Sequence, residues 1–449
     1  MASEMPEVEL GPLCLKIGSG ATPRGGDKVY LDKGDVALIR SQNVRNDGFK
    51  TDGLVYIDAE HANQLANVTV EPHDVLLNIT GDSVARCCQV DPRVLPSRVN
   101  QHVAIIRPRS SELSPRFLRY FLVSPRMQSQ MLGWAHAGAT RNALTKGMIE
   151  SFKVPKPPIS VQSRIADVLG KMDDKIELNR RMNRTLEKTA AALFKSWFID
   201  FDPVHAKAEG RNPGLPAEIA DLFPDSIVES ELGPIPKGWH VAAVDQVAEI
   251  VKGRSYKSAE LQPSDAALVT LKSFLRGGGY REDGLKPYTG RYTPEQVVQP
   301  GEMIVAMTDV TQNAEVIGRP AIVMPDARYG VLVASLDTSI VRPTSGTVST
   351  PFLYGLFSTE TFRAHTYAHS SGTTVLHLAK NAIPSFTFPC PTEQVQNAFV
   401  SFIGPLRARQ QMMHGQNRRL AGLRDTLLPK LMSGEIELAL AESDSKEVL

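Results

Sequence analysis

Short apolar runs separated by Gly, Pro, Asn and Asp occur twice along the chain, and each set ends in a long heptad pattern. The first set contains apolar runs at 36–39, 75–79 and 103–106, and the second contains runs at 269–271, 304–307 and 339–341. Runs of this length between turn residues predict strands. One helix-like stretch follows each set, at 115–132 and 351–367, with Pro in the first turn. The pattern predicts an irregular β-rich domain with late helices, present twice.

The two halves also align with each other when the sequence is shifted by about half its length. Ile17 and Gly20 match Ile250 and Gly253, and from Gly138 to Leu186 the further matches keep one constant shift. The other matched residues are Pro72, Asp74, Arg107, Phe117, Gly138, Phe152, Pro155, Pro157, Gln162, Asn183 and Leu186 in the first half, and Pro300, Glu302, Arg342, Phe352, Gly372, Phe386, Pro389, Pro391, Gln396, Asn417 and Leu420 in the second. A register kept over this length indicates an internal repeat.

Each copy ends in a predicted long helix whose apolar residues recur in alternating steps of four and three. The first series runs from Ile165 to Trp197 and the second from Phe399 to Leu431. A seam of this period is typical of a coiled coil, in which the matched Asn183 and Asn417 would fix the register. Forty helical residues span about 60 Å. Paired antiparallel, the two helices would hold the globular parts at opposite ends of a rod.

These patterns predict an α+β fold with two mixed, β-rich globular domains separated by a long antiparallel two-helix coiled coil, in a pseudo-two-fold repeat. The expected segments are a first recognition domain (1–157), a first helix (158–201), an acidic Pro-rich linker (202–236), a second domain (237–390), a second helix (391–433) and a flexible tail (434–449). The role of the acidic segment is not indicated by its composition.

Composition is that of an ordinary globular protein, with 42% hydrophobic and 22% charged residues in 449. The net charge of +1 conceals segregation, because residues 16–156 carry 19 Lys and Arg against 13 Asp and Glu, whereas residues 202–236 carry 2 against 7. The surplus in the first segment permits a local phosphate-binding face, although ordinary solvated surface explains the charge equally well. Residues 1–15 do not resemble a secretory signal, and no run is long enough for a membrane span. We therefore expect a cytoplasmic protein whose four cysteines, Cys14, Cys87, Cys88 and Cys390, are reduced thiols.

No linear motif indicates catalysis. The sequence contains no GxxxxGK[ST] loop, no Asn-Pro-Pro-aromatic or Asp-Pro-Pro-aromatic tetrapeptide, no HExxH and no GxSxG. The glycines of residues 17–20 are followed by Pro23 and not by a helix, so they favour a recognition loop or a turn over a nucleotide site. His365 and His369 lie four residues apart, a spacing that is more often structural than metal-binding without a third ligand. An active site could still be assembled from distant residues such as Asp309 and His377, which would make the chain an enzyme. A purely structural coiled-coil scaffold is a further alternative.

Two related modules with divergent loops favour a reader of a split DNA target, with each module contacting bases and phosphates through Arg, Lys, Asn and Gln side chains. Two half-sites that are read from one face of the duplex lie one helical turn apart, a distance of about 34 Å. We expect polar residues near the presumed strand ends to contact DNA, and the alternative for any one of them is an ordinary solvated surface position. In the first half these are Arg24, Lys28, Arg40, Gln42, Asn43, Arg45, Asn78, Thr80, Arg86, Arg98, Asn100, Gln101, Arg141, Asn142 and Lys146; in the second they are Arg254, Tyr256, Lys257, Lys272, Arg276, Asp309, Thr311, Gln312, Asn313, Thr373, His377, Lys380 and Asn381.

The ends of the two helices carry the most specific residues. The first closes on LFKSWFIDFDP (193–203), and the second contains NRRL (417–420), LRDTLLPKL (423–431) and SGEI (433–436). These segments, and the Pro and Gln that open each helix (Pro158 with Gln162, and Pro391 with Gln396), resemble the specificity subunit of type I restriction–modification systems. The resemblance covers essentially the whole chain.

That resemblance implies a non-catalytic subunit that binds double-stranded DNA, with one half of a split target read by each domain. It implies two partner methyltransferase subunits, which bind S-adenosylmethionine and methylate adenine N6, and two motor-nuclease subunits. No cofactor is expected on this chain and no metal. A specificity subunit of a bipartite type II system, with a fused methylase and nuclease as partner, is the alternative. The residues implied for the helix pair or the partner interface are Phe194, Trp197, Phe198, Phe201, Leu427, Leu428 and Leu431.

Overall fold

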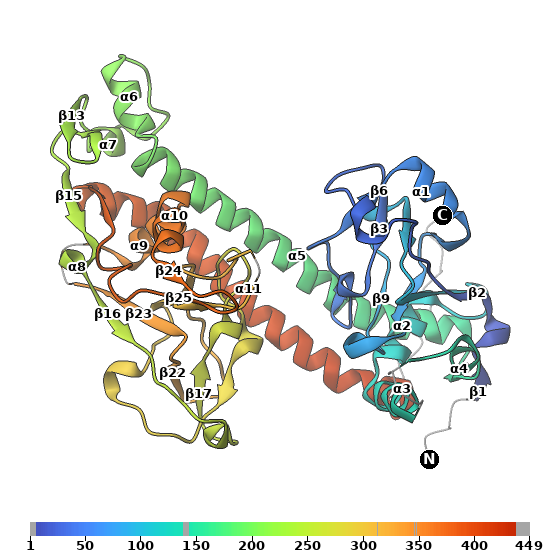
Figure 1. The fold of residues 1–449 in the computed structure, drawn as a ribbon. Coiled ribbons are helices and arrows are strands. Elements are labelled where there is room, and N and C mark those ends of the chain that lie inside the picture. Colours follow the sequence, from blue (N-terminus) through green and yellow to red (C-terminus); the bar gives the residue numbers. More distant parts are fainter. Residues whose placement is uncertain (1–5, 138–142, 312, 345, 347, 437–449) are drawn as a thin grey trace, which may run out of the picture. The chain divides into compact units, whose positions relative to one another are not determined.

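The computed structural model describes residues 6–137, 143–311, 313–344, 346 and 348–436. These divide into two compact units, one formed by residues up to Asn179 together with those from Gly415 onward, and the other by Arg180–His414. Each unit therefore contains one globular module and part of each long helix. The two long helices are α5 (Ile159–Phe198) and α11 (Glu393–Ser433) (Figure 1).

Unit 1 contains two four-stranded sheets, in the orders β2-β11-β8-β9 and β6-β3-β10-β7, a pair formed by β1 and β12, and the small hairpin β4–β5. Its strands are β1 (Glu7–Glu9), β2 (Cys14–Ser19), β3 (Val36–Ile39), β4 (Val44–Arg45), β5 (Gly48–Phe49), β6 (Val55–Ile57), β7 (Thr69–Val70), β8 (Val75–Asn78), β9 (Cys87–Gln89), β10 (Ser97–Val99), β11 (Val103–Pro108) and β12 (Lys153–Pro155). Its short helices are α1 (Ala59–Gln64), α2 (Pro115–Val123), α3 (Pro125–Ala137) and α4 (Lys146–Glu150).

Unit 2 repeats the main features of this layout. The sheet β16-β23-β19-β21 corresponds to β2-β11-β8-β9, the sheet β18-β17-β22 to β6-β3-β10, and the pair β15–β26 to β1–β12. Its strands are β13 (Ile227–Ser230), β14 (Gly233–Pro236), β15 (His240–Ala243), β16 (Ala248–Lys252), β17 (Ala266–Val269), β18 (Lys286–Pro287), β19 (Met303–Ala306), β20 (Thr308–Asp309), β21 (Pro320–Ile322), β22 (Val331–Ala334), β23 (Thr338–Pro343), β24 (Ser370–Ser371), β25 (Leu376–Leu378) and β26 (Thr387–Cys390). Its short helices are α6 (Asp202–Ala208), α7 (Ala217–Ala220), α8 (Val244–Val247), α9 (Thr350–Phe357) and α10 (Glu360–Ala368).

The residues that match between the halves perform the same structural tasks in both units. Arg107 Nε donates to Asp74 Oδ1 at 2.7 Å, and Arg342 Nε donates to Glu302 Oε1 at 2.7 Å. The side-chain amide of Gln162 donates to the carbonyl of Pro157, and that of Gln396 to Pro391. The two copies therefore share a fold and not only a sequence pattern, and the fold is a mixture of helix and sheet as expected.

Two features of the fold differ from the sequence expectation. The single helix-like stretch in each half is two helices, α2 and α3 in unit 1 and α9 and α10 in unit 2. The break in unit 1 comes at Ser124, because the following Pro125 disfavours helical geometry in the residue before it. In unit 2 Thr359 takes an extended backbone and caps α10 through its hydroxyl, which accepts from the Phe362 N–H.

The acidic segment 202–236 is not an extended linker in this structure. It contains α6, α7 and the hairpin β13–β14, and the side chains of Val204, Phe223 and Ile235 are buried in the core of unit 2. Pro203 lies in the first turn of α6, where its missing N–H costs no hydrogen bond. Proline-rich composition predicted a linker because it does not reveal these buried apolar contacts. The predicted tail 434–449 lies outside the described residues from residue 437 onward.

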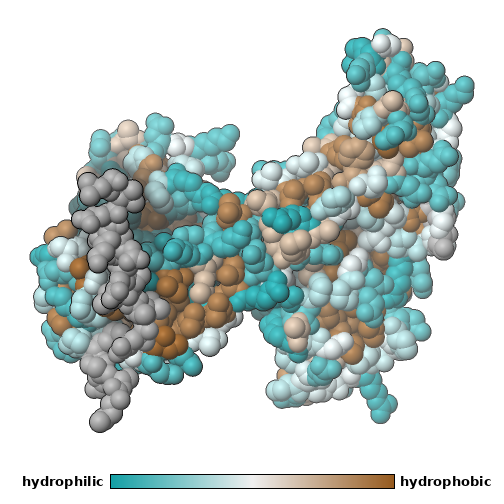
Figure 2. All heavy atoms as spheres, turned by 180° about the vertical axis from the view of Figure 1, so that it is seen from behind, coloured by the Kyte–Doolittle hydropathy of each residue, from teal (hydrophilic) through white to brown (hydrophobic). Residues whose placement is uncertain are grey.

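Apolar residues of the long helices complete the core of each unit. In unit 1, Ile165 and Leu169 of α5 and Leu428 and Leu431 of α11 are buried with the sheet β2-β11-β8-β9. In unit 2, Phe194, Trp197 and Phe198 of α5 pack against Phe352 of α9 and Phe399 of α11. All four cysteines are buried free thiols. Among the described residues, no helix is both long and apolar enough to cross a membrane, and hydrophilic residues cover much of the face shown in Figure 2.

Gly20 and Gly253 provide a test of the shared framework. A Cβ built on Gly20 would lie 2.1 Å from the carbonyl oxygen of Val99, and one on Gly253 would lie 2.1 Å from that of Ser335. Since backbone must move to relieve either contact, we expect Gly20→Ala and Gly253→Ala each to lower the free energy of unfolding by about 1–3 kcal/mol. Gly18→Ala is the matched control, because a Cβ there meets nothing within 4 Å. Urea unfolding curves measure the effect, and equal midpoints for Gly18→Ala and Gly20→Ala would contradict the crowding.

Candidate nucleic-acid interface

The carboxyl ends of three strands meet at one end of the sheets in unit 1. The backbone N–H of Gly20, just after β2, donates to Val103 O, and the N–H of Asn100 donates to Ile39 O at the end of β3. The N–H of Ile79, just after β8, donates to His102 O. Residues 99–103 therefore join the loops that follow β2, β3 and β8. We call the segments 20–30, 40–45, 79–86 and 100–102 loop end 1.

Unit 2 has the same junction. The N–H of Gly253 donates to Thr338 O after β16, the N–H of Ser335 donates to Val269 O at the end of β17, and the N–H of Met307 after β19 donates to Asp337 O. Residues 334–338 thus correspond to residues 99–103. We call the segments 253–257, 270–276, 307–311 and 335–337 loop end 2.

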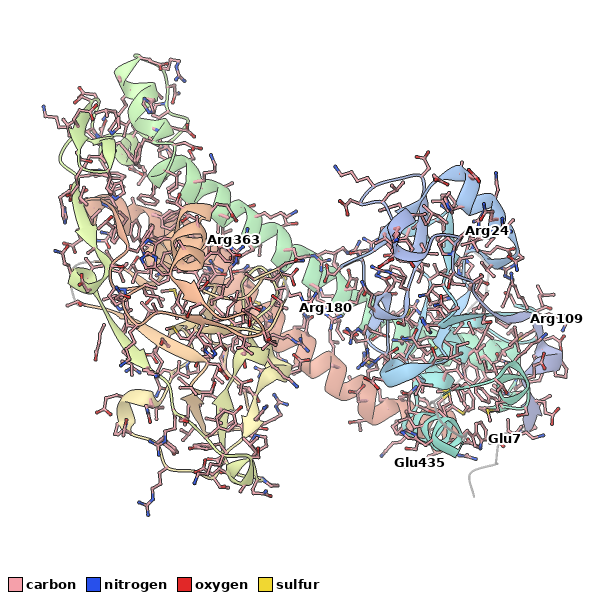
Figure 3. The ribbon with its side chains drawn as sticks, viewed as in Figure 1. Glu7, Arg24, Arg109, Arg180, Arg363 and Glu435 are labelled. Carbon is pink, nitrogen blue, oxygen red and sulfur yellow. The ribbon has the colours of Figure 1, made fainter. Side chains whose placement is uncertain are left out.

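The structure brings many of the predicted polar residues together at loop end 1. Arg24 and Lys28 are exposed in the loop after β2, Arg40 and Gln42 follow β3, Thr80 follows β8, and Gln101 lies at the junction. Figure 3 labels Arg24, beyond the end of β2, and Arg109, which donates to the Pro12 carbonyl before the start of that strand. Arg40 Nη2 and Gln42 Nε2 both donate to Gly53 O, at 2.6 and 3.0 Å, which orients both side chains without burying them. The loops therefore present hydrogen-bonding groups on an ordered framework.

Arg45 and Arg86 lie on neighbouring segments of loop end 1, because the N–H of Cys87 donates to Asn46 Oδ1 at 2.8 Å. Burial lowers the pKa of Arg86, and the positive charge of Arg45 lowers it further, with Asp82 opposing both. Arg45 is exposed and Arg86 is half-buried. Adjacent cations are destabilising unless an anion relieves the repulsion, and a phosphate group supplies such an anion. The pair is therefore the clearest candidate phosphate contact in unit 1.

Three predicted residues are corrected by their burial. Asn43 and Asn78 are 0% exposed and Asn100 is 6% exposed. The Asn43 side chain binds backbone groups of Arg40, Lys50 and Asp52, and the Asn78 amide donates to Ser41 O at 2.8 Å. These amides hold the loops of unit 1 in shape and have no surface to offer a base. Arg98 is likewise directed inward, because its Nε donates to Ala62 O at 3.1 Å.

At loop end 2 the predicted residues Arg254, Lys257, Lys272 and Arg276 are exposed and Thr311 is half-buried, and Asn313, just beyond it, is exposed. Arg276 faces Glu315 at 3.4 Å. Thr373, Lys380 and Asn381 are exposed in the segment around β25, whose His377 pairs with Thr308 of β20. Lys146 is exposed in the corresponding part of unit 1, where Ala143 forms a bridge with Thr80. Three predicted residues, Arg141, Asn142 and Gln312, lie outside the described residues.

Asp309 and His377, the residues considered for an active site, do not form a catalytic pair. Asp309 accepts hydrogen bonds from the N–H groups of Thr311, Val316 and Ile317. Burial alone would raise its pKa, but these hydrogen bonds outweigh burial and lower it. The carboxylate therefore acts as an anchor for its loop. His365 and His369 are similarly bound to backbone carbonyls, those of Ala382 and His365. Within the described residues, no three His, Cys, Asp or Glu side chains form a group that could hold a metal ion.

His102 and Asp337, the residues whose chemistry differs most between the loop ends, were not predicted from the sequence. In unit 1, Gln101 Nε2 donates to His102 Nε2 at 3.0 Å, so the opposite ring nitrogen is left to donate to Thr80 Oγ1 at 2.5 Å. In unit 2, Thr308 Oγ1 donates to Asp337 Oδ1 at 3.0 Å. His102 and Asp337 occupy equivalent positions after matching strands. Comparison of the two halves could have identified His102 and Asp337, because they occupy matching positions beside predicted residues such as Asn100 and Gln101.

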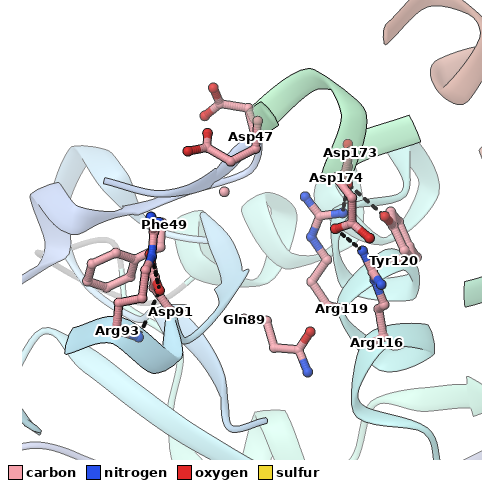
Figure 4. Close-up of a pocket in the computed structure, with 12 residues that line it drawn as sticks. Asp47, Phe49, Gln89, Asp91, Arg93, Arg116, Arg119, Tyr120, Asp173 and Asp174 are labelled. Atoms are coloured by element: carbon pink, nitrogen blue, oxygen red, sulfur yellow. Dashed lines mark hydrogen bonds and ion pairs between the residues drawn. The ribbon is translucent and has the colours of Figure 1, made fainter. Parts of the chain in front are cut away.

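A cavity of about 240 Å³ in unit 1 lies elsewhere, between the β4–β5 hairpin, α2 and α5 (Figure 4). Its walls carry Arg93, Arg116 and Arg119 beside Asp91, Asp173 and Asp174. These groups are already bound to one another, through Arg93–Asp91, Arg116–Asp174 and Arg119–Asp173 ion pairs. The cavity is therefore a packing feature of the helix junction and offers little charge to a ligand.

The residues predicted for the helix pair or the partner interface are mostly interior, and Phe194, Trp197 and Phe198 contact Phe399 of the other long helix. Phe194, Trp197 and Phe198 are at most 3% exposed within unit 2, and Leu428 and Leu431 at most 5% within unit 1. Only Phe201 and Leu427 are half-buried. Large apolar side chains on or directly beside the long helices that are exposed in the structure are Ile159, Leu178, Met182, Ile199, Phe402, Met412 and Leu423. These residues expose more apolar surface to a partner than the predicted set does.

Known proteins with similar sequences indicate which family this chain resembles. Residues 3–188 match the family model described as the type I restriction modification DNA specificity domain. The type I restriction enzyme HindI specificity subunit of Haemophilus influenzae is 25% identical over 423 residues, which cover 83% of this chain and 88% of that protein. The MjaIX specificity subunit of Methanocaldococcus jannaschii is 25% identical, over 76% of this chain and 74% of that protein.

The chain is similar to type I restriction–modification specificity subunits, over its first module in the family model and over most of its length in these relatives. Its fold also matches the crystal structure of a type I restriction-modification system S subunit from M. genitalium, with a TM-score of 0.52 at 14% identity over 96% of each chain. The resemblance inferred from the helix ends is therefore confirmed. The relatives are named specificity subunits and not methyltransferases or nucleases, which agrees with the prediction of a non-catalytic chain.

Removal of the adjacent arginines tests the phosphate contact. We expect Arg45→Ala and Arg86→Ala to weaken binding to specific and non-specific duplex alike, and to reduce the slope of log K against log salt by about one each. Fluorescence anisotropy at several salt concentrations measures this slope. Lys153→Ala is the control, because Lys153 lies on β12 and is paired with Glu9. A slope unchanged in both arginine variants would show that neither residue neutralises a phosphate.

Proposed function

We propose that this specificity subunit reads a split DNA target, with loop end 1 contacting one half and loop end 2 the other. The observation that carries the proposal is the repeated junction of strands with different polar chemistry. His102, Gln101 and Thr80 form the centre in unit 1, whereas Asp337 and Thr308 form it in unit 2. An imidazole and a carboxylate favour different base edges, so two like frameworks would select two unlike half-sites.

The two long helices would connect the modules as an antiparallel pair and set the distance between the half-sites. Within unit 1 Asp173 pairs with Arg424, and Asn179 donates to Asn417 Oδ1; within unit 2 Gln410 donates to the Asn183 carbonyl, and Arg407 pairs with Glu187. In both sets the residue number rises along α5 as it falls along α11. This direction supports the predicted two-helix coiled coil, in which such polar pairs define the register.

The proposed partners are the methyltransferase subunits, two per specificity subunit, with S-adenosylmethionine bound to them and not to this chain. They would methylate adenine N6 in the target, and two motor-nuclease subunits would cleave unmodified DNA. The complex would act in the cytoplasm. The names of the relatives, type I restriction enzyme specificity subunits, support this assembly over the bipartite type II alternative.

Reconstitution with the proposed partner methyltransferase gives a direct test. We expect the purified chain alone to transfer no methyl groups from labelled S-adenosylmethionine, and the reconstituted complex to methylate a duplex that contains both half-sites. Robust methylation by the chain alone would contradict the proposal. Equal retention of the complex on any duplex, with no dependence on sequence, would favour a structural scaffold.

The exposed apolar residues of the helices provide a second test, of partner docking. We expect Met412→Glu and Leu423→Glu to reduce copurification of the methyltransferase at least tenfold, because a charge would be placed in an apolar interface. Both side chains are about half exposed in this structure, at 58% and 49%, so the unfolding midpoint should stay within about 0.5 kcal/mol of wild type. Trp197→Ala is the contrasting variant, since loss of a buried ring should destabilise unit 2 by about 3–5 kcal/mol. Unchanged copurification in both glutamate variants would move the docking surface elsewhere.

A further inference from the structure

The long helices carry charges of opposite sign at one repeated position. Asp173 on α5 and Arg407 on α11 are equivalent in the repeat, at the same shift that aligns Gln162 with Gln396 and Asn183 with Asn417. Framework residues elsewhere in the repeat keep their chemistry, as Arg107 and Arg342 do. A reversal of charge at one position between two related helices therefore requires an explanation.

Each of the two residues has a partner of opposite charge on the facing helix. Arg424 Nη1 lies 2.7 Å from Asp173 Oδ1 in unit 1, and Arg407 Nη1 lies 2.6 Å from Glu187 Oε2 in unit 2. The partners are also non-identical in the repeat, because Glu187 corresponds to Ala421 and Arg424 corresponds to Ala190. The repeated position therefore packs against the same stretch of the opposite helix in both units, but with the charges exchanged.

Both ion pairs are partly removed from water and supported by neighbours. Arg119 and the Tyr120 hydroxyl also bind Asp173 Oδ2, at 2.6 and 2.7 Å. In unit 2 the Arg407 guanidinium lies 4.4 Å from the ring centroid of Tyr354, and Gln410 Nε2 donates to Glu187 at 3.1 Å. Burial is the largest single influence and raises the pKa of both carboxyls, but the neighbouring charges and hydrogen bonds together outweigh it. The main contributions come from Arg119 in unit 1 and Arg407 in unit 2, and each pKa lies below its ordinary value. Charges in such surroundings are screened less than surface charges.

Pairing of a helix with a copy of itself would bring like charges together. With the same antiparallel register, two copies of α5 would place Asp173 opposite Glu187, and two copies of α11 would place Arg407 opposite Arg424. Only the pairing of α5 with α11 puts a cation opposite each carboxylate. Like-charge contacts across an interface suppress incorrect partners.

We propose that Asp173, Glu187, Arg407 and Arg424 form a charge code that makes the two duplicated halves pair with each other and not with copies of themselves. This code goes beyond the proposed DNA function and does not depend on it. A repeat whose helices were identical would pair as readily with a second chain as within one. The exchanged charges remove that ambiguity and ensure that one module of each kind is assembled around each helix pair.

A nicked form of the full chain tests the code. A protease site placed at 210–212, in the exposed turn between α6 and α7, allows the folded protein to be cut into its two halves. After unfolding in urea and refolding, native mass spectrometry counts mixed pairs and self-pairs. We expect the ratio of mixed pairs to self-pairs to be about ten times that of random assortment for the unmodified sequence.

The decisive variant is Glu187→Arg with Arg424→Glu, an exchange that keeps the net charge. In self-pairs of the first half the new cation then faces Asp173, and in self-pairs of the second half the new carboxylate faces Arg407, so self-pairs should predominate. The control is Asp167→Arg with Arg419→Glu, which replaces one acidic and one basic side chain at exposed positions, one on each helix. A random ratio for the unmodified sequence, or predominant mixed pairs in the decisive variant, would overturn the proposal.

Urea unfolding of the intact chain gives an independent measurement if the nicked halves fail to refold. Glu187→Arg should lower the midpoint because it faces Arg407. Adding Arg407→Glu should restore much of the loss, whereas adding Arg424→Glu should deepen it by placing a second carboxylate against Asp173. Equal midpoints for the two double variants would show that the charges do not select the pairing.

Discussion

The two short junctions at residues 99–103 and 334–338 determine what each unit can present. In both, the chain leaves a sheet, forms a tight turn and enters a long central strand, and its backbone groups bind the ends of three other strands. The junction leaves no space for a side chain on Gly20 or Gly253. Because the loops after these strands have little freedom where they begin, a change of side chain at the loop end alters chemistry without altering the framework.

Residues around the junctions divide into those that hold the loops and those that can face a ligand. Asn43, Asn78 and Asp309 belong to the first group, since their side chains satisfy backbone groups of neighbouring turns. Buried polar groups must find such partners, so a polar residue beside a strand end is as often a loop anchor as a contact. We assign His102 and Asp337 to the second group. They occupy equivalent positions and differ in chemistry, whereas the residue that each contacts is a threonine in both halves.

Much of the architecture could be predicted from the sequence, because strands, long helices and internal repeat each leave a periodic signal. Gln162 and Gln396, or Arg107 and Arg342, match in the sequence because they form the same bonds in both units. The structured state of residues 202–236 could not be predicted, since Val204, Phe223 and Ile235 are isolated apolar residues that become a core only in contact with distant segments. Burial of Asn100 was missed for the same reason: local sequence does not show which face of a residue is covered.

The most direct test of the account is methylome sequencing of the host with two variants of this gene, one altered at loop end 1 by Gln101→Ala with His102→Ala, and one at loop end 2 by Asp337→Ala. The account predicts that the first variant relaxes or changes only one half of a split adenine-methylated motif, that the second affects only the other half, and that the gap between the halves stays constant. A contiguous motif, or the loss of both halves in either variant, would contradict the assignment of one half-site to each loop end.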